Sequence, residues 1–207
     1  MLSRIVLLGL LACSLSVNAQ LFHAFKWKHL GPFTTPTATT NDGSWTATGQ
    51  GWIEDILITE KYWYAAAMTG GVYSSRNGGC TWKKIDQDSV QLGMLCLYEA
   101  NGTIYRGTGR THHGQDFGSG ILQSSNHGRS WHSTPLTLQH HEQKVVWDIE
   151  GNAQEILAIT DTEIWKGTTN KNEKWNQIYT APDENLRSIV YNARDDSHIL
   201  VAGKELY

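Results

Sequence analysis

Two short segments hold the residues whose types could bind a metal ion. Thr111–Asp116 and Gln139–Glu142 each contain two adjacent histidines followed by a carboxyl side chain. Imidazole and carboxylate groups are common ligands of zinc and related metals. Adjacent side chains on an extended strand point to opposite sides, so one pair does not supply two ligands to one ion. Neither segment has the His-Glu-x-x-His spacing of zinc proteases. We therefore predict exposed polar loops, with no metal and no cofactor.

Carboxylates are the second group with possible chemistry. Glycoside cleavage needs two of them across the scissile bond, and no pair in this sequence can be nominated by spacing. Asp55 and Asp148 fall on predicted strands that each begin a repeat unit, where they could face a central channel. A carboxylate in such a place is more often solvated than catalytic. The sequence therefore nominates no catalytic residue.

One turn motif occurs twice and organises the chain. Residues 75–82 and 124–131 both read Ser-x-Asn-x-Gly-x-(Ser/Thr)-Trp, and their tryptophans lie 49 positions apart, a spacing typical of propeller blades. The Asn side chain can accept a backbone N–H inside the turn, and the Gly supplies a positive φ. The Trp then begins the outgoing strand, where its ring can fill the gap between neighbouring sheets. The structural residues of the two turns are Ser75, Asn77, Gly79, Trp82, Ser124, Asn126, Gly128 and Trp131.

A third, degraded copy spans residues 168–175 and ends 44 positions after the second. It keeps Asn170 and Trp175 but has Asn172 where the glycine belongs. Asn is the commonest substitute at a left-handed position, so the copy remains plausible.

These motifs resemble the Asp-box, or bacterial neuraminidase (BNR) repeat, with Asn in place of the usual Asp. Together with Trp27–Phe33 and Met68–Ser75, they make nearly the whole chain resemble secreted bacterial propellers of the sortilin-like and sialidase-like superfamily. The resemblance implies the fold more strongly than the function, since such repeats occur in sialidases, xyloglucanases, sortilin-type receptors and photosystem assembly factors. It also implies that the motif turns lie away from the ligand face.

The strand pattern predicts an all-β fold, a β-propeller of four-stranded antiparallel blades with about three and a half blades present. The expected strands are 52–59, 62–68, 72–75 and 82–85; then 92–98, 103–107, 121–124 and 131–135; then 145–149, 156–160, 163–167 and 175–179; and finally 186–191 and 199–202. Residues 25–30 resemble a ring-closing strand. Because incomplete rings leave exposed sheet edges, we expect an N-terminal part of a larger ring, with four-bladed closure as the alternative.

The N-terminus predicts export. Arg4 precedes an apolar run, and Val17-Asn18-Ala19 suits signal peptidase, so we expect a signal peptide over 1–19, cleavage after Ala19 and a propeller domain over 20–207. A lipoprotein signal ending at Cys13 is the alternative. The sequence predicts no transmembrane segment. A net charge of −3 without a basic stripe argues against nucleic acid as a partner. The expected location is secreted or cell surface.

The two cysteines of the exported chain could in principle form a disulfide. Cys80 lies on a predicted hairpin turn and Cys96 in a predicted inner strand, so we expect their Cα atoms to be too far apart for a bridge. We predict two free thiols.

Two hypotheses for function follow. The residues before Gly70-Gly71 read Tyr64–Thr69, without the Phe-Arg-Ile-Pro segment of sialidases or the Arg-Thr-Asp segment of xyloglucanases. The first hypothesis is therefore a secreted binding or scaffold propeller for protein or glycan ligands. The alternative is the N-terminal part of a glycoside hydrolase whose catalytic residues lie partly outside this chain.

Connectivity predicts a ligand face. Strand directions alternate, so the motif turns lie on one face, and the long segments 31–51, 110–120 and 137–144 lie on the other. Extended loops on a rigid scaffold commonly carry recognition. The candidate ligand contacts, in loops expected to approach one another, are Trp45, His112, His113, Asp116, Phe117, His140 and His141.

Overall fold

The computed structural model describes residues 37–39, 46–48, 52–68, 70–85, 93–109, 118–139, 142–169, 174–181, 185–192 and 199–203. The chain divides into two compact units, residues 1–30 and residues 31–207, and all described residues belong to the second. The predicted signal peptide and the predicted closing strand at 25–30 lie outside the described residues. No helix in the described part of the chain is long and apolar enough to cross a membrane.

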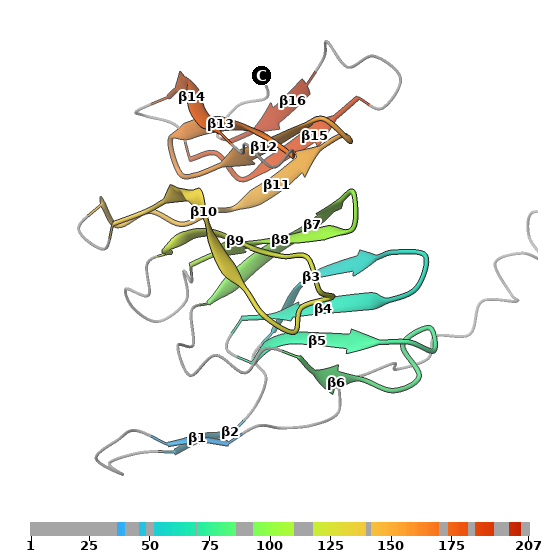
Figure 1. Cartoon of the computed structure of the whole chain (residues 1–207). Helices are drawn as coiled ribbons and strands as arrows, with labels where there is room; N and C mark the ends of the chain where they lie inside the picture. The colour runs from blue at the N-terminus through green and yellow to red at the C-terminus, as the bar shows by residue number, and fades with distance from the viewer. Residues whose placement is uncertain are drawn as a thin grey trace, which may run out of the picture. The chain divides into compact units, whose positions relative to one another are not determined.

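Antiparallel sheets in chain order make up the described fold (Figure 1), which is that of β-propeller blades. The first blade consists of β3 (Ile53–Ile58), β4 (Trp63–Ala67), β5 (Gly71–Ser75) and β6 (Lys83–Lys84). The second consists of β7 (Met94–Ala100), β8 (Thr103–Thr108), β9 (Gly120–Ser124) and β10 (His132–Thr137). The third consists of β11 (Asp148–Gly151), β12 (Glu155–Ile159), β13 (Glu163–Thr168) and β14 (Trp175–Thr180).

Two strands of a fourth blade follow, β15 (Ser188–Tyr191) and β16 (Ile199–Ala202). The prediction of an all-β propeller with three full blades and part of a fourth is thus confirmed. One addition lies in the segment predicted as a long loop, where β1 (Thr37–Thr39) pairs with β2 (Thr46–Thr48). Most strand ends differ from the prediction by one or two residues, and the largest difference is at β11, which begins at Asp148 and not at Val145. Residues 145–147 instead connect two blades, and the Val146 amide donates to the Thr108 carbonyl of the second blade at 3.1 Å.

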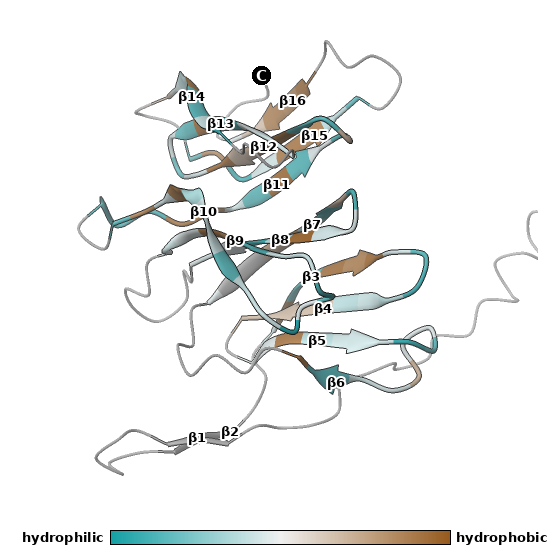
Figure 2. Ribbon diagram, in the orientation of Figure 1, coloured by the Kyte–Doolittle hydropathy of each residue, from teal (hydrophilic) through white to brown (hydrophobic). Residues whose placement is uncertain are grey.

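The core lies between consecutive blades. Tyr64, Ala66 and Val72 of the first blade pack against Leu97 and Ile104 of the second. A larger cluster joins the second and third blades, and a third cluster joins the third blade to β15 and β16. In Figure 2 apolar residues lie on strands such as β3 and β16, and hydrophilic residues lie at many of the turns. Burial between sheets, rather than within one, therefore holds the blades together.

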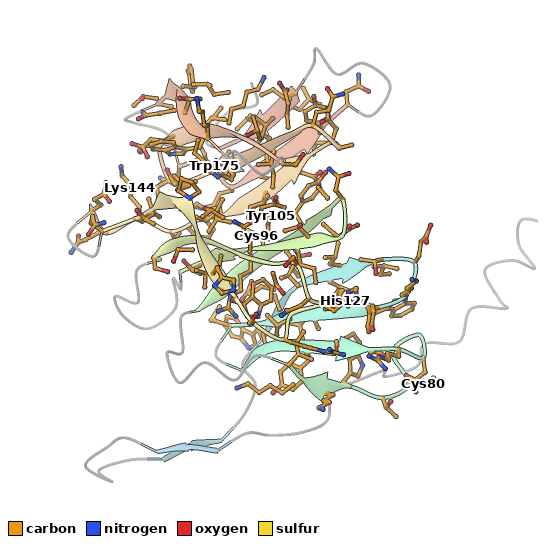
Figure 3. The ribbon with its side chains drawn as sticks, viewed as in Figure 1. Cys80, Cys96, Tyr105, His127, Lys144 and Trp175 are labelled. Atoms are coloured by element: carbon orange, nitrogen blue, oxygen red, sulfur yellow. The ribbon has the colours of Figure 1, made fainter. Side chains whose placement is uncertain are left out.

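The two described cysteines do not form a disulfide. Cys80 is exposed on the turn after β5, and Cys96 is buried in β7 (Figure 3); neither is in a disulfide. The prediction of two free thiols is confirmed.

Candidate functional site

The turn between β5 and β6 is held by its own side chains. The Ser75 hydroxyl accepts the amides of Asn77 and Gly79 at 3.3 and 2.9 Å, and donates to Asn77 Oδ1 at 2.9 Å. Asn77 Oδ1 accepts the Thr81 amide at 2.8 Å, and Asn77 Nδ2 donates to Thr81 Oγ1 at 2.9 Å. Gly79 has a φ of 80°. The hydrogen bond from a backbone group to Asn and the positive φ at Gly are those that the sequence predicts.

The turn between β9 and β10 repeats this network. Ser124 accepts the Gly128 amide at 2.8 Å, and Asn126 Oδ1 accepts the Ser130 amide at 3.0 Å. Gly128 has a φ of 80°. His127 occupies the place that Gly78 has in the first turn, and the two residues have φ values of 61° and 62°. His127 is therefore held in a conformation that is uncommon for a residue with a Cβ.

The motif tryptophans pack on blade faces. Trp82 packs against Ala65, Ala67 and Tyr73 of its own blade. Trp131 packs against the cluster between the first and second blades, and the Arg106 guanidinium lies 4.5 Å from its ring centroid. Trp175 packs against the cluster between the second and third blades. Trp175 thus lies between two blades as Trp131 does, whereas Trp82 packs within its own blade, and Asn170 lies outside the described residues.

A groove of about 580 Å³ lies where the turn of the second blade meets the outer part of the first blade. Ser74 and Ile85 of the first blade line it. On one side Ile85 packs so closely on Gly128 that a Cβ at position 128 would lie 2.2 Å from Ile85 Cδ1. The second turn is therefore seated on the first blade, and both blades line one groove.

A group of rings lies at this groove. His127 stacks on Tyr62, with ring centroids 4.8 Å apart, and Tyr62 in turn stacks on Tyr64 at 5.8 Å. Figure 3 shows His127 reaching the strands of the first blade. Arg76 Nη2 donates to the Tyr62 hydroxyl at 2.9 Å. Burial, with a smaller contribution from Tyr62 and Glu99, raises the pKa of Tyr64 to about 12, so its hydroxyl is neutral at physiological pH.

Basic side chains lie beside these rings. Four exposed basic side chains line the groove, one from each turn and two from β6, and no aspartate or glutamate is among its described lining residues. Glu60 and Glu99, with a single lysine, Lys61, line a neighbouring hollow that shares Tyr62 and His127. The positive charge is therefore concentrated on one side of the stacked pair, where it creates a local field of the sign that attracts anions. The four cations are Arg76, Lys83, Lys84 and Arg129.

The carboxylates of the innermost strands have structural partners. Asp55 Oδ2 accepts the Leu97 amide of the next blade at 2.7 Å, and Asp148 Oδ2 accepts the Ile189 amide of its next blade at 2.9 Å. Burial raises the pKa of Asp55, and the hydrogen bonds from the amides of Leu97 and Ile56 oppose that rise. Both carboxylates are partly exposed and line a hollow at the innermost strands, and each also joins two blades, a structural role that the sequence did not indicate.

The predicted ligand contacts all lie outside the described residues. These are Trp45, His112, His113, Asp116, Phe117, His140 and His141. The bases of their loops are described, and the Gly118 amide donates to the Lys144 carbonyl at 2.9 Å while the Leu138 amide donates to the Ser119 carbonyl at 3.1 Å. The loops at 110–117 and 140–141 therefore start from neighbouring backbone. Within the described residues, no three His, Cys, Asp or Glu side chains cluster to hold a metal ion.

Sequence reasoning missed the groove. Its cations occupy the variable positions of the two motifs or directly follow the motif Trp, so each one appears as an ordinary surface charge. The available signal was their proximity to the motifs, since Arg76, Lys83, Lys84 and Arg129 all lie within or next to one.

Comparisons with known proteins support the fold. Neither a protein-family model nor a curated protein matches the sequence. The extracellular domain of the BT4673 one-component system from B. thetaiotaomicron is similar with a TM-score of 0.54 and 12% identity, over 84% of this chain and 24% of that chain. YCF48 bound to D1 peptide has a TM-score of 0.55 and 10% identity, over 82% of this chain and 58% of that chain. The computationally designed Ika4 protein has a TM-score of 0.53 and 10% identity, over 76% of this chain and 91% of that chain. This chain thus spans about a quarter of the BT4673 domain.

Proposed function

We propose that this chain is an exported propeller module that binds protein or glycan ligands, and that the groove between its first two blades is a ligand site. The groove is the observation that carries the proposal, because it combines four cations with a stacked pair of rings on a rigid scaffold. Rigid sheets that present polar and aromatic side chains in a concave surface are typical binding sites. One of the similar structures, YCF48, is bound to a peptide.

The glycoside hydrolase alternative has less support. The carboxylates at Asp55 and Asp148 accept backbone amides of the following blades, which gives them a structural task. The Asp-box assignment and export remain part of the proposal, as do contacts from the opposite face through Trp45, Asp116, Phe117 and the two histidine pairs. Those contacts would form a second surface, independent of the groove.

Ligand selection with the full chain tests the proposal. Immobilised protein is screened against a random-peptide phage library and a glycan array, and the enriched ligands are then measured on variants. His127→Asn removes the stacked ring and keeps a residue type that tolerates positive φ, and Arg129→Glu reverses one cation. We expect both to weaken binding at least tenfold. Lys174→Glu, an exposed change outside the groove, is the control. Ligands that bind all three variants equally would contradict the groove as the site.

A further inference from the structure

The chemistry of the groove identifies the class of its ligand. We propose that it binds an acidic, extended peptide segment with an aromatic residue; this inference rests on the proposed function. The lining cations come from both blades, with Arg76 and two lysines on the first blade and Arg129 on the second. An extended segment directs alternate side chains to opposite sides, so carboxylates on both of its sides can meet cations.

Hydrogen-bonding capacity favours carboxylates over sugar hydroxyls. A hydroxyl both donates and accepts, so sugar recognition needs acceptors as well as donors. The described lining side chains contain no Asp, Glu, Asn or Gln, and the side-chain acceptors they offer are few, such as the hydroxyls of Ser74 and Thr81. Lysine and arginine only donate. The lining therefore suits a ligand rich in acceptors, and carboxylates form strong charge-assisted hydrogen bonds with such donors.

The size of the groove also suits a short peptide. About 580 Å³ lies within the range of sites for ligands of small to moderate size, and a few amino-acid residues fill such a volume. The Tyr62–His127 pair offers a ring surface at the same groove, and aromatic side chains pack well on such rings. An acidic segment that carries one Tyr, Phe or Trp would use both features.

The charge balance of the chain strengthens the choice. The whole sequence has 17 basic and 20 acidic residues, so four cations at one groove, with no acid among its described lining residues, are a local concentration and not a reflection of composition. Fields of this kind accelerate association with ligands of opposite charge and fall with ionic strength. Binding through this groove should therefore weaken as salt is raised.

Fluorescence anisotropy with the full chain tests the inference. The first probe is a labelled library of eight-residue peptides with Asp or Glu at alternate positions and one central Tyr. The second replaces every acid by Asn or Gln. We expect the acidic probe to bind at least tenfold more tightly at low salt, and to lose at least fivefold in affinity between 50 and 300 mM NaCl, about the range over which surface charges become screened.

Variants locate the contact. Lys83→Glu combined with Arg129→Glu should weaken binding of the acidic probe at least tenfold and flatten its salt dependence, since both charges lie on exposed side chains. Lys174→Glu combined with Lys166→Glu makes the same change in net charge on the third blade, outside this groove, and should reduce affinity less than threefold. Circular dichroism at rising temperature checks that both double variants stay folded. Equal losses in the two double variants would overturn the inference, because the attraction would then come from the charge of the whole molecule.

Other outcomes separate this inference from the proposed function. If the acidic and amide probes bind equally, or an oligogalacturonate or heparin fragment displaces the acidic probe and binds more tightly, acidic peptide is the wrong class. Binding that remains sensitive to His127→Asn would still support the groove as a ligand site. If no peptide or glycan binding responds to His127→Asn or Arg129→Glu, the proposed function itself fails.

Discussion

At Gly128 the absence of a Cβ allows the turn of the second blade to pack against the first blade. The φ of 80° at this glycine lies in the left-handed region, where a Cβ is strained. A Cβ there would also lie 2.2 Å from Ile85 Cδ1, in the first blade. Gly78 in the other turn has a φ of 62° but no atom closer than 4.0 Å to its ideal Cβ. The two glycines therefore separate backbone strain from packing.

We expect Gly128→Ala to lower the free energy of unfolding by about 2 kcal/mol, because the strain of the backbone adds to the cost of moving the end of the Ile85 side chain. Gly78→Ala should cost about 1 kcal/mol, since only the backbone term applies, and His127 already takes the same conformation with a Cβ. Urea unfolding of both variants measures the difference. Equal losses at the two sites would contradict the assigned role of Ile85.

An aspartate at an equivalent position of two inner strands, β3 and β11, joins each strand to the next blade. Asp55 precedes Ile56 in β3, and Asp148 precedes Ile149 in β11; each carboxylate accepts the amide of its own following residue at 2.7 and 2.9 Å, respectively. The second oxygen of each accepts an amide of the next blade. In β7 the corresponding residue is Cys96, whose Sγ lies 3.8 Å from the Val146 carbonyl. The innermost strands thus carry side chains that connect sheets as well as pack.

Asp148→Ala should loosen the fourth blade before the others. It removes the acceptor of the Ile189 amide and of the Ser188 hydroxyl, at 2.9 and 3.0 Å, and hydrogen bonds to a charged group contribute about 2 kcal/mol. We expect the Ile189 amide to exchange at least tenfold faster in hydrogen exchange, with the amides of β8 unchanged. Asp55→Ala should instead accelerate exchange at Leu97. Uniform acceleration in both variants would argue against local links.

The acid at position 55 also predicts a pH dependence. Burial raises the pKa of Asp55 in the folded state above the ordinary value of 3.8, so the unfolded chain binds fewer protons between the two pKa values. The free energy of unfolding therefore falls as pH rises through this interval. Asp55→Asn lacks this titration, so the stability of the wild type relative to the variant should decrease from pH 3.5 to pH 6.

Urea unfolding at several pH values measures that difference. Glu60→Gln, at an exposed acid in the turn after β3, is the control for removal of one carboxylate. A wild-type advantage over Asp55→Asn that grows with pH would contradict the direction of the shift.

At the scale of the whole molecule, the two thiols report different events. Cys80 is exposed on a turn, whereas Cys96 lies in the core between the second and third blades, and burial raises the pKa of its thiol well above 9.0. The thiolate is the reactive form, so alkylation of the folded chain should label Cys80 and leave Cys96 unlabelled. Labelling of Cys96 should follow the unfolding transition in urea, as read by peptide mass spectrometry. Rapid labelling of Cys96 without denaturant would show that the blades separate in the native state.

Sequence alone determined the turns and the strands of the blades, because the interactions that form them join residues close together in the chain. The turn networks of Ser75 and Ser124 close within a few residues, so a motif of eight positions is sufficient to predict them. The alternation of apolar residues placed the strands of the blades for the same reason. The start of β11 was wrong by three residues, since contacts with the second blade, distant along the chain, decide where residues 145–147 run.

Tertiary structure alone decided which faces are covered and where the groove lies. Ile56, Leu97, Ile149 and Ile189 occupy the same place in successive inner strands, yet their exposures are 55%, 5%, 2% and 1%. The sequence pattern is alike at all four positions, but a preceding blade of the described chain covers only the last three. The groove likewise combines β6 with a turn more than forty residues later in the chain. Burial and clustered charge depend on distances between segments, which local sequence does not encode.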